Sequence, residues 1–181
     1  MPFSTRTKIN GETLSLSGDA KGGVNISSRF VDNELTVTFS SRNDLTVTGT
    51  GNLDATIIGG AENDRFDFSG ATGNYNFRTG GGNDNVVDGT GNNTFDGGTG
   101  SDNFTFASEG GTPPEVDTIN NYVVTEDDID ISTGAATVSN VVQTDSNTVT
   151  ILLNDGDQII VNSETDITRA QIAGQVDFII V

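Results

Sequence analysis

The chain has 181 residues and a net charge of −18, from 26 acidic and 8 basic residues, and it contains no cysteine and no histidine. This length suits one domain with a buried core. The acidic balance argues against partners such as nucleic acid or anionic membrane surfaces, and it favours a cation. The missing side chains exclude thiol nucleophiles, thiolate or imidazole metal sites, and any catalytic pair that needs histidine.

Apolar residues make up 33% of the chain, and no stretch of about 18 apolar residues occurs, so we expect no membrane insertion. The first residues, MPFSTRTKINGETLSLS, lack the apolar segment of a secretory leader. The 23 glycines and the abundant Asn, Asp and Thr favour turns and strands over helices.

Residues 1–42 alternate apolar and polar residues in ETLSLSG, GVNISSRF and ELTVTFSS. A period of two with turn residues between the runs predicts β-strands. We expect this segment to be an N-terminal β-cap or to form further, degenerate coils of the repeat that follows it.

Residues 43–107 contain an internal repeat. Aligned on its Asn-Asp pairs, the chain shows units that begin at Asn43, Asn63, Asn83 and Ser101, with steps of 20, 20 and 18 residues. A shorter period of nine residues relates the apolar residues Phe77, Val86, Phe95 and Phe104, and the glycines Gly73, Gly82, Gly91 and Gly100. A short fixed period with turn glycines and one apolar residue per unit predicts a solenoid.

These residues resemble the repeats-in-toxin family. GGTGSDNFT (97–105) matches the nonapeptide G-G-x-G-x-D-x-U-x in full, where U is a large apolar residue, and TGGGNDNVV (79–87) lacks only the first glycine. The resemblance implies an all-β fold, a right-handed parallel β-roll that binds Ca²⁺. It also implies export by type I secretion machinery, for which the last residues, DFIIV, look like the uncleaved signal. A final sheet strand would show the same pattern.

In such a roll, glycines with positive φ aim backbone carbonyls at one point, and Ca²⁺ takes six to eight oxygen ligands. The candidate carbonyl ligands belong to Gly80, Gly82, Gly98 and Gly100. We expect the carboxylates of Asp44, Asp64, Asp84 and Asp102 to stack along one edge, because these residues recur in every second nonapeptide. Ions would lie between the 64/84 and 84/102 loops, with a further candidate position between 44 and 64. The alternative is that the Asn-Asp pairs and glycines are only turn residues.

The other edge is expected to carry Ala55 or Leu53, then Tyr75 and Asn93, and no ladder of carboxylates. The runs GTGN and ATGN predict one row of Thr50, Thr72 and Thr90 and another of Asn52, Asn74 and Asn92. Such rows resemble the ice-binding repeats of bacterial adhesins. The plain interpretation is stacked turns whose asparagines hydrogen-bond along the roll.

Residues 108–181 are predicted to be a C-terminal cap. TPPEVDTINNYVVTEDDIDIS resembles the segment that ends rolls of this family, and Asp117, Asp128 and Asp130 are candidates for a further metal site or are simply solvated. TVTILLNDGDQIIV predicts a β-hairpin with its turn at 154–157. TDITRAQI predicts one short helix capped by Thr165 or Asp166.

The function hypothesis combines these features. Rows of carboxylates repel in a cytosol poor in calcium, whereas outside the cell each ion would bind and stabilise only the folded state. We expect no enzymatic activity, because the chain offers no nucleophile and base pair and no room for the enzyme domain that precedes the roll in relatives.

The leading hypothesis is a secreted structural protein that self-assembles into a filament or sheet of a biofilm matrix or surface layer. The alternatives are a monomeric adhesion module that binds glycan or ice through the Thr and Asn edge, and an accessory module of a longer secreted protein.

Overall fold

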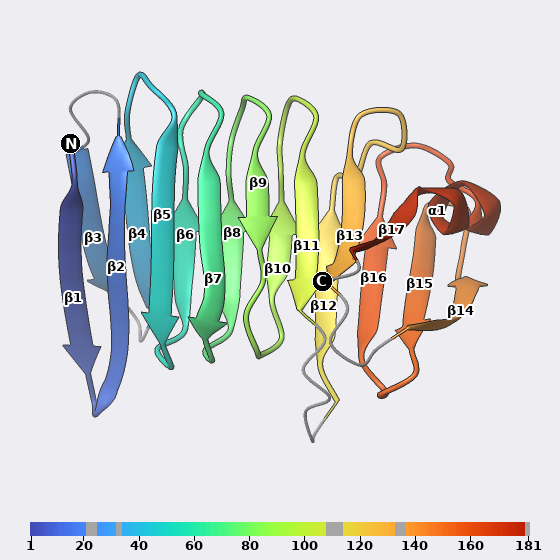
Figure 1. The fold of residues 1–181 in the computed structure, drawn as a ribbon, viewed down its shortest axis with the longest axis horizontal. Coiled ribbons are helices and arrows are strands. Elements are labelled where there is room, and N and C mark those ends of the chain that lie inside the picture. Colours follow the sequence, from blue (N-terminus) through green and yellow to red (C-terminus); the bar gives the residue numbers. More distant parts are fainter. Residues whose placement is uncertain (21–24, 32–33, 108–113, 133–136, 180–181) are drawn as a thin grey trace.

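The structure is a computed structural model, and it describes residues 1–20, 25–31, 34–107, 114–132 and 137–179. Nearly all of it is β-structure, a β-solenoid of about four turns in which parallel strands stack into two facing sheets (Figure 1). The predicted fold class, a β-roll or solenoid, is therefore confirmed. In the part of the chain that the structure describes, no helix is long and apolar enough to cross a membrane.

Each coil contributes one strand to each sheet. The first sheet contains, in spatial order, β1 (Phe3–Ile9), β2 (Glu12–Ala20), β5 (Leu45–Gly51), β7 (Arg65–Ala71), β9 (Asn85–Val87), β11 (Asn103–Ala107), β13 (Asp128–Ser132) and β17 (Val176–Ile179). The second contains β14 (Val138–Gln143), β15 (Thr148–Leu153), β16 (Gln158–Asn162), β12 (Val116–Asn120), β10 (Thr94–Asp96), β8 (Tyr75–Arg78), β6 (Ala55–Ile58), β4 (Glu34–Ser40) and β3 (Asn25–Val31).

The parallel stack continues past both ends of the repeat at 43–107. Strand β4 pairs in parallel with β6, and beyond the repeat β12 and β13 pair in parallel with β10 and β11. The later strands keep the apolar alternation of the repeat, so they extend the same core. Because β12 and β13 form another coil, Asp127 continues one edge of the repeat and Asp117 continues the other.

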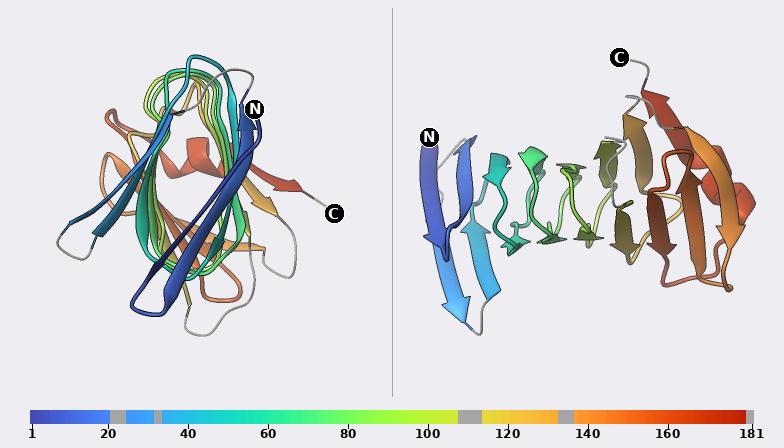
Figure 2. Two further views of the ribbon diagram at one scale, coloured as in Figure 1. Left: turned by 90° about the vertical axis from the view of Figure 1, so that its left-hand side faces the viewer. Right: turned by 90° about the horizontal axis from the view of Figure 1, so that it is seen from below.

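The N-terminal segment is a cap of two antiparallel hairpins, β1 with β2 and β3 with β4. Figure 2 shows both hairpins at one end of the stack. The Phe3 ring lies 5.9 Å from the Phe39 ring, between centroids, and helps to close this end of the core. The apolar alternation does not predict β1, because threonines occupy the two positions between Phe3 and Ile9 that face the same side.

The nine-residue period places one apolar side chain per unit in the core. Phe77, Val86, Phe95 and Phe104 are each at most 1% exposed. Phe77 and Phe95 stack across adjacent coils with ring centroids 5.3 Å apart and an interplanar angle of 7°. Full burial of such a side chain stabilises a fold by about 1.5–3 kcal/mol, so these residues account for much of the cohesion between coils.

The C-terminal cap contains the predicted hairpin, β15 with β16, and β14 adds a third antiparallel strand. Helix α1 (Arg169–Gln175) begins after Thr168, which forms a capping box with Gln171. The predicted caps, Thr165 and Asp166, are wrong, because only Thr168 has Gln three residues later to return the hydrogen bond. Strand β17 shows that the DFIIV pattern forms a sheet strand up to Ile179; Ile180 and Val181 lie outside the described residues.

Candidate metal centre

One edge of the solenoid is formed by turns that each end in an aspartate. These turns lead from the second sheet into β7, β9, β11 and β13, and their last residues are Asp64, Asp84, Asp102 and Asp127. All four side chains are buried, with exposed fractions of 3%, 2%, 3% and 5%. The edge therefore carries a continuous buried row, which we call the aspartate ladder.

Each carboxylate of the aspartate ladder binds the backbone of the coil before it. The Oδ1 atoms accept hydrogen bonds from backbone N–H groups: Asp64 from Leu45 at 2.9 Å, Asp84 from Asp64 at 2.7 Å, Asp102 from Asp84 at 2.9 Å and Asp127 from Asp102 at 3.0 Å. The ladder thus links successive coils through one oxygen of each carboxylate.

The members of the aspartate ladder differ in the partner of their second carboxylate oxygen, Oδ2. Oδ2 of Asp64 accepts from the N–H of Gly60 at 3.1 Å, and Oδ2 of Asp127 accepts from Val123 at 2.8 Å. Oδ2 of Asp84 is buried and has no hydrogen-bond partner. The nearby Thr79 hydroxyl donates to the carbonyl of Gly97 at 3.0 Å instead. Asp84 therefore presents one buried oxygen that is open to a further positive partner.

The aspartate ladder disfavours negative charge in the absence of a cation. Burial raises the pKa of Asp84 to about 7 and that of Asp127 to about 6. Burial also raises the pKa of Asp64 and Asp102. Neighbouring ladder carboxylates raise the pKa of Asp84 further. Among the described residues, no lysine or arginine forms an ion pair with the ladder, so backbone N–H groups are left to offset its charge.

The four glycines predicted as carbonyl ligands lie in the same turns. Gly80, Gly82, Gly98 and Gly100 all have positive φ, between 86° and 128°. A Cβ atom on Gly98 would lie 2.0 Å from the carbonyl oxygen of Gly80. That oxygen accepts a hydrogen bond from the N–H of Thr99 at 3.1 Å. The carbonyl of Gly80 thus points to the next turn beside the ladder and bonds to the next coil.

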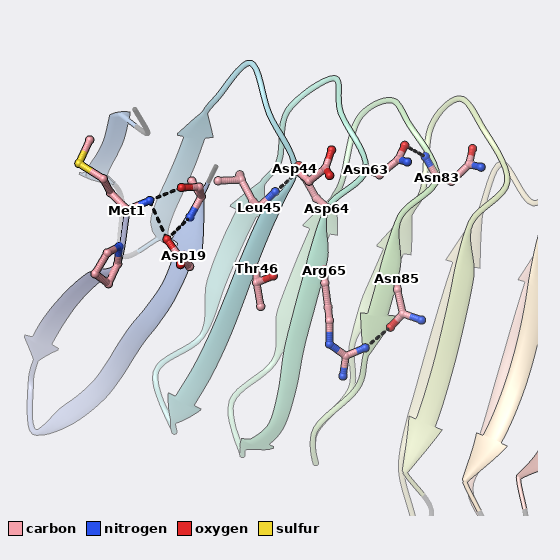
Figure 3. A pocket seen from close by; sticks show the side chains of 12 residues that line it. Met1, Asp19, Asp44, Leu45, Thr46, Asn63, Asp64, Arg65, Asn83 and Asn85 are labelled. Carbon is pink, nitrogen blue, oxygen red and sulfur yellow. Dashed lines mark hydrogen bonds and ion pairs between the residues drawn. The ribbon is translucent and has the colours of Figure 1, made fainter. Parts of the chain in front are cut away.

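Asp44 does not belong to the aspartate ladder, so this part of the prediction is wrong. The register of β5 and β7 pairs Thr46 with Arg65, which places Leu45, not Asp44, opposite Asp64. The offset between the first two coils is therefore one residue shorter than alignment of Asn43 with Asn63 suggests. The apolar residues set this register, since Val47 pairs with Phe66. Asp44 and Asp64 both line a shallow cavity of about 730 Å³ between the first turns and the N-terminal residues (Figure 3).

Asp127 is the ladder member that the repeat pattern does not predict. The insertion after residue 107 lengthens the step from Asp102 to Asp127 to 25 residues, which breaks the nine-residue period. A signal was present in the sequence, because DNFTF and DDIDI share an aspartate followed by alternating apolar residues. Asp130 lies on the outer face of β13, where Oδ2 accepts from the Asn103 side chain at 2.7 Å, and the neighbouring Asp128 is exposed.

The second edge carries acidic residues in its later coils. The structure places Ala55, not Leu53, opposite Tyr75. Asn93 follows, and its Oδ1 accepts from the N–H of Tyr75 at 2.7 Å. The next position is Asp117, whose Oδ1 accepts from the N–H of Asn93 at 2.8 Å. At the positions equivalent to the aspartate ladder, the first carboxylate on this edge is therefore Asp117.

Three carboxylates are buried at this second edge, those of Asp88, Asp117 and Asp157, with exposed fractions of 1%, 5% and 7%. Asp88 accepts from the amide of Asn93 at 2.6 Å, and Asp157 accepts from the N–H of Glu115 at 2.9 Å. Burial raises the pKa of Asp117 to about 7 and that of Asp88 well above its usual range. Asp117 is thus separated from the aspartate ladder by the width of the solenoid.

The predicted Asn and Thr rows are shorter than expected. Asn92 donates its N–H to Oδ1 of Asn74 at 2.8 Å, but Asn74 donates to Asp54 at 2.7 Å, so Asp54 takes the place predicted for Asn52. Thr50 pairs with Gly70, two positions before Thr72, so Thr72 lacks that neighbour. The bonds agree with the plain interpretation, in which asparagines link stacked turns.

Within the described ranges, no three Asp or Glu residues gather closely enough to hold a metal ion by themselves. A Ca²⁺ site on the aspartate ladder would therefore combine one carboxylate per turn with backbone carbonyls, a donor set of hard oxygens that Ca²⁺ accepts. The unpartnered Oδ2 of Asp84 and the adjacent glycine turns fit this donor set.

A comparison with protein-family models gives no match, and a comparison with curated protein sequences gives none either. The fold therefore rests on the structure, and the resemblance to repeats-in-toxin proteins rests on the residues of the repeat.

Proposed function

We propose that the chain is a calcium-binding β-roll of the repeats-in-toxin type that folds outside the cell and serves as a self-assembling structural protein. The observation that carries this proposal is the aspartate ladder, a row of buried carboxylates with no basic partner among the described residues. A bound cation would offset the free-energy cost of burying these negative charges.

The hydrogen bonds between coils do not by themselves require a negatively charged side chain. Asn93 accepts a backbone N–H from the preceding coil with a neutral amide, and Asp84 accepts the equivalent N–H with a carboxylate. The amide makes the same bond without burying a charge, which is costly in an apolar environment. Repeated use of aspartate on one edge therefore favours a role that needs negative charge.

The residues that would hold the ion are Asp84 and Asp102, with Asp64 as a third carboxylate one coil further along. The carbonyls of Gly80, Gly82, Gly98 and Gly100 would complete the set. The ion would supply positive charge between successive turns. Ca²⁺ suits this set better than Mg²⁺, because Mg²⁺ requires near-octahedral geometry and dehydrates reluctantly. Asp44 is one position out of register with this row, and Asp117 and Asp130 lie away from it, so we leave all three out of the proposed set.

The proposed location outside the cell follows from the coupling of calcium binding to folding. Sites with affinities of roughly 10⁻⁴ to 10⁻³ M are empty in a cytosol poor in calcium and filled outside the cell. Mutual repulsion would keep the chain unfolded for passage through type I secretion machinery, and calcium would then stabilise the folded state. This role is structural and needs no catalytic residues.

The assembled state is a homopolymer, a filament or sheet of a biofilm matrix or surface layer. It is favoured by the open edges that both sheets present at each end of the solenoid. A monomeric module that binds glycan or ice is the competing function, and measurement of particle size distinguishes it.

The experiment is a calcium titration of the chelated protein, followed by far-UV circular dichroism and light scattering. We expect β-signal to appear in the range of roughly 10⁻⁴ to 10⁻³ M calcium, with particle growth after folding. Magnesium at equal ionic strength is the control and should produce a weaker response. A β-signal that is identical in chelator and in calcium would refute the proposal, and a folded monomer in calcium would refute its assembly part.

A further inference from the structure

Charge is distributed unevenly along the chain. Residues 1–42 contain five basic and four acidic residues, whereas residues 108–181 contain one basic and thirteen acidic residues. The solenoid axis follows the sequence, so these two segments form opposite ends of the molecule (Figure 1). The molecule therefore has one end that is nearly neutral with local positive charge, and one end that is strongly negative.

The local positive charge of the first end lies on the edge strand β1. Arg6 and Lys8 are exposed on this strand, which among the described strands pairs only with β2. We call these two residues the head charges. They lie two positions apart, so they share one face of the strand.

The acidic end is formed by the C-terminal cap. Asp145, Glu164 and Asp166 are exposed there, and we call them the tail charges. The loop that carries Glu164 and Asp166 packs on the turn between β14 and β15 through backbone bonds from Ile167 to Ser146 at 2.9 Å and from Ser163 to Asn147 at 3.0 Å. Figure 2 shows this cap at the end opposite the hairpins.

Strand directions allow the first sheet to continue from one copy into the next. β1 is antiparallel to β2, and β2 is antiparallel to β5, so β1 runs in the same direction as β5. The parallel pairs from β5 onward extend this direction to β17, the last strand of the sheet. A copy shifted along the axis would therefore place its β1 parallel to β17 of its neighbour.

We propose that copies of this chain associate head to tail, with β1 of one copy against the β17 end of the next, and that the head and tail charges select this polarity. The inference rests on the proposed self-assembly and specifies its contact. Head-to-head and tail-to-tail contacts would each bring like charges together, whereas head-to-tail contacts bring opposite charges together. A contact between different surfaces that does not close into a ring produces an open filament.

The test uses charge reversal at each end of the full chain in calcium and low salt, where screening is weak. The head variant is R6E/K8E and the tail variant is E164K/D166K. We expect each variant alone to raise the critical concentration for polymerisation by roughly tenfold or more, because the head and tail charges of each copy then have the same sign and repel. An equimolar mixture of the two should polymerise again, because the acidic head of one variant complements the basic tail of the other.

The matched control is R65E/R78E, which makes the same change in net charge on exposed positions in the middle of the roll; circular dichroism in calcium verifies the fold of every variant. Polymers of R6E/K8E that form as readily as those of the control, or a mixture that does not recover, would overturn the inference. The first outcome would mean that Arg6 and Lys8 only protect an edge strand from aggregation. A wild type that stays monomeric in calcium would instead overturn the proposed assembly itself.

Discussion

Asp84 and Asn93 accept equivalent backbone bonds on opposite edges of the solenoid, one with a carboxylate oxygen and the other with a neutral amide oxygen. Each binds the N–H of the coil before it at 2.7 Å. Asp84 additionally has a buried Oδ2 atom without a partner, and burial raises its pKa to about 7. This pair of residues allows the structural role of the side chain to be separated from a metal-binding role.

The substitution Asp84→Asn tests this separation. The asparagine keeps an oxygen for the N–H of Asp64 and removes the charge, so we expect the calcium-free protein at neutral pH to become more stable, with a higher melting temperature. The calcium-induced gain in melting temperature should fall, because a ligand oxygen loses its charge. Thermal unfolding with and without calcium measures both effects.

Asp54→Asn is the control, because Asp54 accepts the N–H of Asn74 at 2.7 Å on the exposed second edge. An equal loss of the calcium response in both variants would contradict a site on the aspartate ladder.

At the scale of the elements, the turns determine how closely the coils approach. Gly97 opens the turn that ends at Asp102, and a Cβ atom on Gly97 would lie 2.1 Å from Oδ2 of that carboxylate. The first position of this turn therefore has no room for a side chain while the ladder carboxylate points inward. In contrast, a Cβ atom on Gly174 of helix α1 would have no neighbouring atom within 4 Å.

Alanine substitution at these two glycines should have opposite effects. Gly97→Ala is expected to lower the free energy of unfolding by about 1–3 kcal/mol, because the added methyl group displaces the Asp102 carboxylate. Gly174→Ala is expected to raise it by about 0.5–1 kcal/mol, because alanine is the better helix former. Urea unfolding in calcium measures both, and a neutral Gly97→Ala would show that the turn adapts without cost.

At the scale of the whole molecule, the buried carboxylates make stability depend on pH. Burial raises the pKa of Asp84 and Asp117 to about 7 and that of Asp127 to about 6, from an ordinary value of 3.8. The folded state therefore binds more protons than the unfolded state between these values. The resulting stabilisation is fully present below about pH 4 and is lost as pH rises through 6 to 7.

We therefore expect the chelated protein to be more stable at pH 5 than at pH 7.5, as measured by urea unfolding at each pH. Calcium should reduce this difference, because the ion stabilises the ionised carboxylates at the higher pH. Asp84→Asn should also reduce it, since it removes one of the titrating groups. Greater stability of the chelated protein at pH 7.5 would contradict the assigned burial effects.

The sequence by itself determined the features that depend on local spacing. The nine-residue period identified the core residues Phe77, Val86, Phe95 and Phe104, which are all buried. Alignment of the repeat units also placed Asp64, Asp84 and Asp102 on one edge, because equivalent positions of successive coils recur on the same side of a solenoid. The helix, the hairpin of β15 and β16 and the alternation in the N-terminal strands were likewise local patterns.

Only the tertiary structure decided the register between coils. The steps along the aspartate ladder are 20, 18 and 25 residues, so no constant period identifies all of its members. Register follows the packing of apolar residues across coils, and a shift of one residue moves a side chain to another position. For this reason Leu45 lies opposite Asp64 where Asp44 was expected, Asp127 extends the ladder, and Asp117 belongs to the opposite edge.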